Sequence, residues 1–389
     1  MAPIYGQVVA GPPGSGKTTY CTGMQEYLRL LGRNAWVINL DPANEIPTSY
    51  RTSYRNHDDN NDDDDNGQDM THNHQTTAEN NRQLPYETLL DVCDSVVNLS
   101  SVMQQLGLGP NGGLVYCMEY LEAHVEDLVQ MIQHRILSTA APDGGMYVLL
   151  DLPGQVELYT HGTAVPRLLH QLTKVLDLRL CGVQLIDAHY CTEAANFLSA
   201  ALLGLTTMLR LELPMVNVLS KVDLLALYGP LPFSLEYFTE CQDLDRLLPF
   251  LQGGNWENEA MADSQRDEED DWAYTEDPEY QQARRRTRQS PFFRKHEKLH
   301  QALAEVVTDF SLLSFVPLDI SSAESVGRVL ARIDKSNGYV FHGAAANHPT
   351  RDLFQCAVQA DTNAFETLAD IQERIQEARQ QPSQSQSQT

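Results

Sequence analysis

The chain has 389 residues, of which 42% are hydrophobic, and its 27 basic and 53 acidic residues give a formal charge of −26. This length and apolar content suffice for one large α/β domain, whereas so strong an acidic balance argues against direct binding to nucleic acid, whose phosphates it would repel. The seven cysteines form no C-x-x-C pair, which argues against a zinc or disulfide framework. We also see no signal peptide and no apolar run of membrane-spanning length, so we expect a cytoplasmic or nuclear protein without a membrane partner.

Two segments hold most of the negative charge. Residues 56–81 carry eight acidic side chains and no Lys or Arg, and residues 257–279 carry eleven acidic side chains and one arginine. Such segments cannot bury enough apolar surface to offset the entropy lost on ordering. The expected organisation is therefore a domain with two disordered acidic insertions, a C-terminal helical extension and a disordered tail: 1–341 (insertions at about 56–83 and 253–289), 342–380 and 381–389.

The N-terminal segment contains a phosphate-binding pattern. An apolar run at 4–10 predicts a buried strand, and helical spacing at 20–31 predicts a helix. Between them a glycine-rich loop ends in Lys-Thr-Thr, the context that a P-loop needs. Its backbone N–H groups would surround a phosphate chain, Lys17 would reach the β- and γ-phosphates, and Thr18 would ligate Mg²⁺. The predicted phosphate-binding residues are Gly11, Pro12, Pro13, Gly14, Ser15, Gly16, Lys17, Thr18 and Thr19.

Two further predicted strands end in carboxylates. The strand at 34–40 is followed by Asp41, which could hold a magnesium-bound water, orient the attacking water, or simply form the turn before Pro42. The strand at 146–150 ends at Asp151, which suits Mg²⁺ coordination opposite Thr18. Three residues follow Asp151 in this segment. We predict that Gly154 contacts the γ-phosphate, that Gln155 orients the attacking water, and that Glu157 assists catalysis.

Residues 179–186 predict a further strand, and the last pair of strands carries the expected base-binding residues. After the strand at 215–219 comes Ser220-Lys221-Val222-Asp223. The Asp223 carboxylate can accept both N–H groups of guanine, and the Lys221 stem would cover one face of the base. The strand at 314–318 precedes Ser322 and Ala323, which could meet the guanine O6, although Ser322 would serve equally as a helix N-cap.

Between predicted helices at 96–106 and 114–137 lies Gly-Leu-Gly-Pro-Asn-Gly-Gly, which by itself predicts a tight exposed loop. Its Gly109-Pro110-Asn111 resembles the signature of the GPN-loop GTPases, and residues 107–121 are similar to one eukaryotic branch of that family. The resemblance implies a dimer in which this loop enters the partner's nucleotide site. By the same resemblance, Asn111 would position the phosphate end or the attacking water. In the base-binding element, Ser220 departs from the usual GTPase asparagine, which puts the tightness of base binding in question.

The alternation of strands and helices predicts a three-layer α/β P-loop NTPase fold with a mostly parallel sheet and a helical insertion near 235–251. The resemblance covers 4–341 apart from the insertions. It implies hydrolysis of GTP to GDP with Mg²⁺, a homodimer or a heterodimer with another family member, and RNA polymerase subunits or assembly factors as partners in cytoplasmic assembly and nuclear import. The expected catalytic residues are Lys17, Asp41, Asn111, Gln155 and Glu157. A nucleotide-dependent scaffold with negligible turnover and a P-loop kinase remain as alternatives.

Overall fold

The structure, a computed structural model, describes residues 4–44, 84–139, 146–228, 231, 233–251, 291–310, 312–339 and 371. Both predicted acidic insertions and the predicted tail lie outside these described residues. Of the predicted C-terminal extension only Ile371 is described, and it is buried beside α8 (Ala194–Leu211) and α12 (Pro291–Asp309).

The described strands form one sheet with the order β3-β2-β4-β1-β5-β6-β7, and every pairing in it is parallel. Most strand residues are apolar and buried on both faces, which is the pattern of a sheet covered by helices on either side. The strands are β1 Ile4–Ala10, β2 Asn34–Asn39, β3 Thr88–Asp91, β4 Met146–Asp151, β5 Leu178–Asp187, β6 Met215–Ser220 and β7 Phe315–Leu318. The predicted fold class is confirmed, and β3 is an additional strand that the sequence analysis missed.

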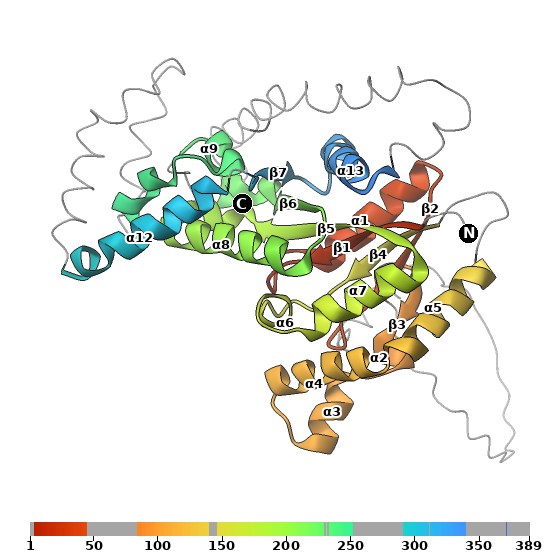
Figure 1. The fold of residues 1–389 in the computed structure, drawn as a ribbon. Helices are drawn as coiled ribbons and strands as arrows, with labels where there is room; N and C mark the ends of the chain where they lie inside the picture. Colours follow the sequence, from red (N-terminus) through yellow and green to blue (C-terminus); the bar gives the residue numbers. More distant parts are fainter. Residues whose placement is uncertain are drawn as a thin grey trace, which may run out of the picture.

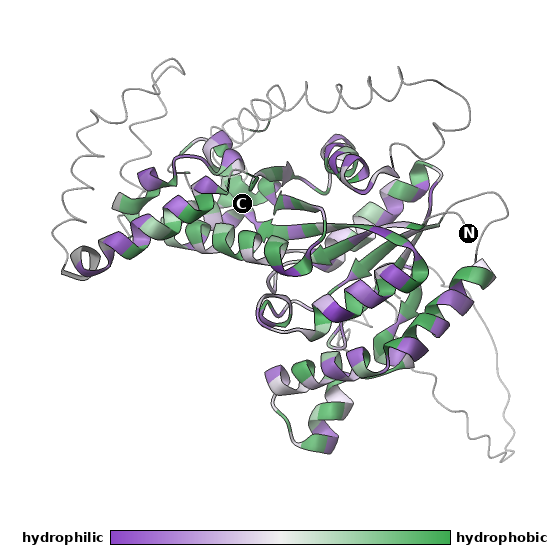
Figure 2. Ribbon diagram, viewed as in Figure 1, coloured by the Kyte–Doolittle hydropathy of each residue, from purple (hydrophilic) through white to green (hydrophobic). Residues whose placement is uncertain are grey.

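Helices cover both faces of the sheet (Figure 1). Helices α1 (Lys17–Leu30) and α13 (Ala323–Asn337) lie on one face, and α5 (Val125–Thr139) and α7 (Ala164–Leu176) lie on the other. Hydrophobic residues concentrate in the strands and on the inward sides of the helices (Figure 2). The remaining helices are α2 Val92–Ser95, α3 Leu99–Leu106, α4 Pro110–Ala123, α6 Glu157–Thr160 and α9 Leu235–Glu240, with the 3-10 helices η2 Ala188–Thr192, η3 Val222–Leu227 and η4 Leu244–Phe250.

Two predicted helices differ from those observed. The helix expected at 114–137 is two helices, α4 and α5, which meet at His124. Helix α4 also begins earlier than predicted, because Pro110 occupies its first position, where a missing N–H costs nothing. The helical insertion expected at 235–251 consists of the short α9 followed by η4, with Cys241 in a left-handed conformation where α9 ends.

Helix α8 corrects the expectation that no stretch reaches membrane-spanning length. Among the described residues it alone is long and apolar enough, by length and composition, to cross a membrane. Half of this helix is buried within the protein, where Phe197, Ala201 and Leu205 pack into the interior. Its apolar composition is therefore accounted for by its position beside β5 and α12.

Candidate nucleotide site

All the carboxyl ends of the strands meet at one edge of the sheet, because every strand runs in the same direction. Polar residues are placed there by the chain itself: Asp91, Asp151, Asp187 and Ser220 are the last residues of β3, β4, β5 and β6. The register pairs Asn39 with Asp151. Ligands of open α/β sheets bind at this edge, so the topology gathers the predicted site residues in one place.

The loop from Gly11 to Gly16 has a backbone shape that requires glycine at several points. Gly11, Gly14 and Gly16 have φ angles of 150°, 80° and 90°. A Cβ atom on Gly11 would lie 2.5 Å from the Leu185 carbonyl oxygen. Gly16 is the N-cap of α1 and supplies no side-chain cap, so N–H groups of the first helical turn are available to an anion.

Lys17 lies over this loop. Its Nζ donates hydrogen bonds to the carbonyl oxygens of Gly11 at 3.1 Å and Pro12 at 3.3 Å, and the residue is only 8% exposed. Burial lowers the pKa of Lys17, while the carboxylates of Asp151 and Asp41 act in the opposite direction. The amine is thus held beside the phosphate-binding loop, close to two acidic groups.

The segment after β4 approaches the same loop. A Cβ atom on Gly154 would lie 2.9 Å from the Lys17 Nζ and 3.3 Å from the Pro13 Cα, so this position tolerates no side chain without a shift. Gln155 and Glu157 follow it, half-buried, and Glu157 begins α6. The structure thus brings Gly154 to the P-loop as predicted, with Gln155 and Glu157 in the adjoining turn.

Two carboxylates flank Lys17. Asp151 is 2% exposed, and its Oδ2 accepts a hydrogen bond from the Tyr86 hydroxyl at 2.9 Å. Burial raises the pKa of Asp151 to about 7; Asp41 adds to the shift, and Tyr86 and Lys17 oppose it. Burial likewise raises the pKa of Asp41, whose Oδ1 accepts a hydrogen bond from the Ala43 N–H at 2.9 Å.

These groups suit Mg²⁺ chemically. Thr18, Asp41 and Asp151 offer hard oxygen donors beside a phosphate-binding loop, and Mg²⁺ is usually held by one or two carboxylates, nucleotide phosphates and water. No group of three or more His, Cys, Asp or Glu side chains with metal-binding geometry occurs in the described part of the chain. The donor set therefore fits an ion that arrives with its nucleotide better than a metal caged entirely by protein.

The segment after β6 contacts the P-loop directly. The Ser220 hydroxyl donates a hydrogen bond to the Ser15 carbonyl oxygen at 2.8 Å. Lys221 Nζ donates to the Gly14 carbonyl oxygen at 2.6 Å and forms an ion pair with Asp187 at 2.7 Å. Ser220 thus supports the phosphate-binding loop. The sequence analysis considered only that serine lacks the amide group of the usual GTPase asparagine, and it did not predict this contact.

The remaining predicted base-binding residues lie at the rim. Asp223 is an exposed residue of η3. Partial burial of its carboxyl group raises the pKa, and Asp319 adds to the shift. Ser322 is the N-cap of α13 and accepts a hydrogen bond from the Ser325 N–H at 3.4 Å, and Ala323 begins the helix. The capping role of Ser322 is therefore observed.

Gly109, Pro110 and Asn111 lie where α4 follows α3. They are exposed at the start of α4, with Gly109 as its N-cap, and α3 and α4 form the lower tip of the molecule (Figure 1). Asn111 is thus in a helical first turn, which corrects the predicted loop. Within the part of the chain that the structure describes, no hydrogen bond or ion pair joins Asn111 to the P-loop.

Three residues of the edge were missed by sequence reasoning: Tyr86, Asp91 and Asp187. Asp91 and Asp187 each end a strand, and that position is the same signal that identified Asp151. Asp91 accepts a hydrogen bond from Asn39 at 2.8 Å. For Tyr86 the only signal is the return of apolar residues at Leu84-Pro85-Tyr86 after the first acidic insertion.

A parallel sheet, a glycine loop over a buried lysine, and acidic strand ends define a P-loop nucleotide-binding protein. The family described as "Conserved hypothetical ATP binding protein" matches residues 9–78 and 77–270. GPN-loop GTPase 2 of Danio rerio is 39% identical over 96% of this chain and 93% of its own length, and GPN-loop GTPase QQT1 of Arabidopsis thaliana is 36% identical over 96% and 98%. The chain therefore belongs to the GPN-loop GTPase family.

The predicted resemblance is thus confirmed, including the likeness to one eukaryotic branch, that of the GPN-loop GTPase 2 proteins. The enzyme class is confirmed at the level of the family. GPN-loop GTPase 2 of Saccharomyces cerevisiae is 33% identical over 87% of this chain and 75% of its own length. Among solved structures, an apo-form GTPase from Pyrococcus abyssi is 19% identical and covers 86% of this chain and 97% of its own, with a TM-score of 0.48.

Proposed function

We propose that this chain binds GTP with Mg²⁺ at the carboxyl edge of the sheet and hydrolyses it to GDP and phosphate. The observation that carries the proposal is the convergence of Lys17, Gly154, Asp151 and Asp41 around one glycine loop. Phosphoryl transfer needs positioning and charge stabilisation more than covalent chemistry, and this arrangement supplies both.

Each residue has a distinct part in this proposal. The P-loop N–H groups and Lys17 bind the phosphates and stabilise the charge that develops on them. Thr18 and Asp151 would hold Mg²⁺, with Asp41 holding one of its waters, and the ion would neutralise phosphate charge when bound. Gln155 orients the attacking water, with Glu157 beside it, because both follow Gly154 in the half-buried turn.

Base recognition is assigned to the rim. The Asp223 carboxylate accepts the two N–H groups on the guanine edge, which adenine does not offer. Lys221 is tied to Gly14 and Asp187, so its stem is fixed at the entrance to the base site. The family description names ATP, whereas the relatives are named GTPases, so the two names imply different purine bases.

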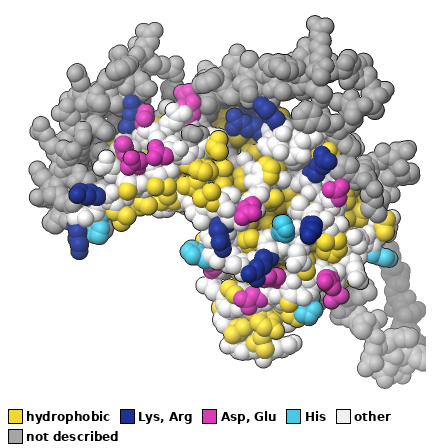
Figure 3. Space-filling view, in the orientation of Figure 1, with side chains coloured by type: hydrophobic (Ala, Val, Ile, Leu, Met, Phe, Trp, Pro, Cys, Tyr) yellow, Lys and Arg dark blue, Asp and Glu magenta, His cyan; other side chains and the backbone are white. Residues whose placement is uncertain are grey.

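The protein acts as a dimer in this proposal. Asn111 is exposed at the start of α4 and, among the described residues, has no hydrogen bond or ion pair to its own P-loop. Hydrophobic side chains gather at the tip formed by α3 and α4 (Figure 3). Leu106, Val115 and Tyr116 are 50%, 39% and 40% exposed there. A second copy, or another family member, would cover this surface and receive Asn111 beside its own γ-phosphate.

The test is single-turnover hydrolysis by Asn111→Ala, with Asn196→Ala as the control. Both asparagines are exposed in the first turn of a helix. Asn111→Ala should slow hydrolysis by about 100-fold, the cost of one transition-state contact, and leave GTP affinity unchanged. Equal rates in the two variants would remove Asn111 from the mechanism, and absence of GTP hydrolysis by the wild-type chain would overturn the proposed function.

By resemblance to its family, the protein acts in cytoplasmic assembly and nuclear import of RNA polymerases. The features that support a cargo role are the Gly154 segment, which lies against the P-loop, and the exposed tip formed by α3 and α4. Affinity purification in the presence of GTP and of GDP tests the proposal. We expect polymerase subunits or assembly factors to be recovered with one nucleotide and not with the other. Recovery of neither group of proteins, or equal recovery with GTP and GDP, would contradict the proposal.

A further inference from the structure

Tyr86 lies between two polar side chains at the carboxyl edge. The residue is 7% exposed. Its hydroxyl donates a hydrogen bond to the Asp151 Oδ2 at 2.9 Å and accepts one from the Asn44 Nδ2 at 3.1 Å. Because a phenol has a single proton, the donation from Asn44 directs that proton to Asp151.

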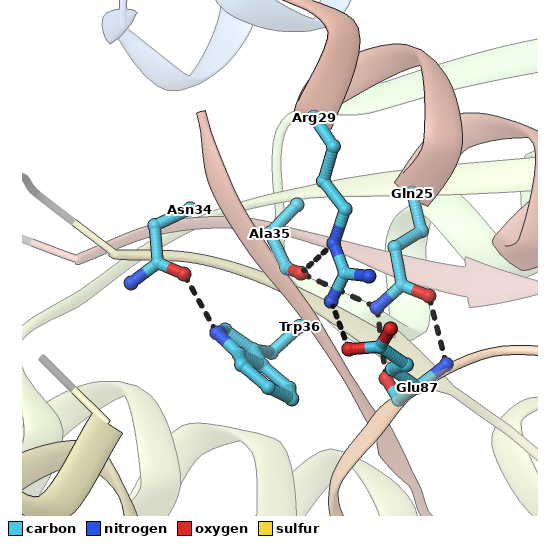
Figure 4. Close-up of polar contacts among 6 residues, drawn as sticks. All are labelled: Gln25, Arg29, Asn34, Ala35, Trp36 and Glu87. Atoms are coloured by element: carbon cyan, nitrogen blue, oxygen red, sulfur yellow. Dashed lines mark hydrogen bonds and ion pairs between the residues drawn. The ribbon is translucent and has the colours of Figure 1, made fainter. Parts of the chain in front are cut away.

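The backbone beside Tyr86 is clamped to α1, the helix that begins with Lys17 and Thr18. The Gln25 side chain is 3% exposed. It accepts a hydrogen bond from the Glu87 N–H at 2.9 Å and donates one to the Glu87 carbonyl oxygen at 2.8 Å (Figure 4). Arg29 adds an ion pair with the Glu87 carboxylate at 2.9 Å, so the segment that carries Tyr86 is fixed relative to the phosphate-binding helix.

The clamp continues to the neighbouring strand. Gln25 Nε2 and Arg29 Nε each donate a hydrogen bond to the Ala35 carbonyl oxygen at 3.2 Å (Figure 4). Ala35 is in β2, the strand that leads to Asp41. Helix α1, strand β2 and the Tyr86 segment are therefore joined through two side chains, and all three border the proposed metal site.

This geometry has a consequence for Asp151. A buried carboxylate without a fixed partner can rotate between orientations, whereas a donor on Oδ2 fixes the group and leaves Oδ1 for another ligand. Partners of this kind tune metal sites, and their loss typically weakens metal binding. The Tyr86 hydroxyl is the one side-chain hydrogen-bond partner found for Asp151 among the described residues.

We propose that Tyr86 is a positioning residue that orients Asp151 toward the nucleotide-bound Mg²⁺ through its hydroxyl, held by the Gln25–Glu87 clamp. The inference rests on the metal site of the proposed function. It assigns to the Tyr86 hydroxyl an effect on metal affinity that is separable from nucleotide affinity and from folding.

The test compares Tyr86→Phe with Tyr147→Phe. Tyr147 is in the same strand as Asp151, and its buried hydroxyl accepts a hydrogen bond from Gln7, so the control loses a buried hydroxyl without touching Asp151. Mn²⁺ affinity of the GDP complex is measured by electron paramagnetic resonance, and GDP affinity is measured separately in EDTA. Tyr86→Phe should weaken Mn²⁺ binding about tenfold and leave metal-free GDP binding unchanged, whereas Tyr147→Phe should change neither.

Asn44→Ala provides a second variant, because it removes the bond that directs the phenol proton and leaves Tyr86 in place. It should weaken Mn²⁺ binding in the same direction and by less. Equal Mn²⁺ affinity in Tyr86→Phe and Tyr147→Phe would overturn the assignment. If the wild-type GDP complex itself binds no Mn²⁺, it is the proposed metal site that fails, so the two failures are distinguishable.

Discussion

The two edges of the sheet use charge in opposite ways. At the amino edge Arg33 forms a two-point ion pair with Asp334, at 2.9 Å and 2.5 Å, and its guanidinium lies 3.9 Å from the Tyr339 ring centre. At the carboxyl edge the carboxylates of Asp41 and Asp151 share the vicinity of one lysine, and Asp41 adds to the raised pKa of Asp151.

The difference separates residues that stabilise the fold from residues that perform its chemistry. The pair joins a buried Asp334 to a mostly buried Arg33 side chain and fastens α13 to the loop before β2. An excess of buried acid is unfavourable in the free protein and becomes favourable when a cation and a phosphate chain arrive. We therefore expect substitutions at the amino edge to reduce stability, and substitutions at the carboxyl edge to reduce activity.

The largest effect should come from Lys17→Ala. The ammonium donates hydrogen bonds to carbonyl oxygens of the P-loop and is proposed to bind the phosphates, so its loss should slow single-turnover GTP hydrolysis by about 10³-fold. Lys174→Ala, an exposed lysine in α7, is the control. Comparable rates in the two variants would place the phosphates elsewhere on the molecule.

At the opposite edge, Arg33→Ala should lower the free energy of unfolding by about 3 kcal/mol, because it leaves the Asp334 carboxylate buried without its partner. Urea unfolding followed by circular dichroism measures this. Arg167→Ala removes an ion pair in which the arginine side chain is 65% exposed, so it should cost less than about 1 kcal/mol. The turnover of folded Arg33→Ala should match the wild type, and a loss of activity greater than the loss of stability would contradict the division between the edges.

Asp151→Asn should stabilise the nucleotide-free protein at pH 8. The pKa of Asp151 rises from 3.8 to about 7 on folding, so the folded state binds this proton more tightly, and the unfolding free energy falls as the pH rises through that window. An uncharged amide avoids the loss, and we expect a gain of about 4 kcal/mol at pH 8. The gain should be absent near pH 4.

Urea unfolding at both pH values, without metal or nucleotide, measures the effect of Asp151→Asn. The same variant should lose Mg²⁺-dependent hydrolysis. A variant less stable than the wild type at pH 8 would show that the Asp151 carboxylate stabilises the free protein, and would remove the contrast between the edges.

The smallest effect expected is that of Ser220→Ala. The single hydroxyl proton lies within reach of the carbonyl oxygens of Ser15 and Ile186, which are 2.8 Å and 3.1 Å from the hydroxyl oxygen. Removal of the hydroxyl should cost about 1 kcal/mol of stability and slightly weaken nucleotide binding through the P-loop. Ser199→Ala, an exposed serine in α8, should be neutral. A selective loss of guanine preference in Ser220→Ala would instead return this residue to base recognition.

The sequence predicted those parts of the fold that have a local pattern. Six strands were predicted because their residues are mostly apolar, and the carboxylate or lysine that follows such a run can be assigned to the edge without a structure. Strand β3 was missed because it has four residues and follows the first acidic insertion. The split between α4 and α5 was missed because both helices continue the same apolar spacing.

The contacts that position the site were beyond sequence reasoning for a different reason. Tyr86 and Asp151 are 65 positions apart, and Arg33 and Asp334 are 301 apart. Neither pair has a spacing that marks it in a single sequence, because only the strand order brings them together. Asn111 was predicted to lie in a loop, but α4 begins at Pro110, so Asn111 is the second residue of the helix.

The most direct test of this account is competition between GTP and ATP for the purified chain, carried out with wild type and with Asp223→Asn. Wild type should bind GTP in preference to ATP, because only guanine presents two N–H donors to the Asp223 carboxylate. The amide of Asp223→Asn should shift the preference toward xanthosine triphosphate, whose base offers a carbonyl oxygen in place of the guanine amine. Equal binding of GTP and ATP by the wild type, or an unchanged preference in the variant, would contradict the assignment of this edge to a guanine nucleotide.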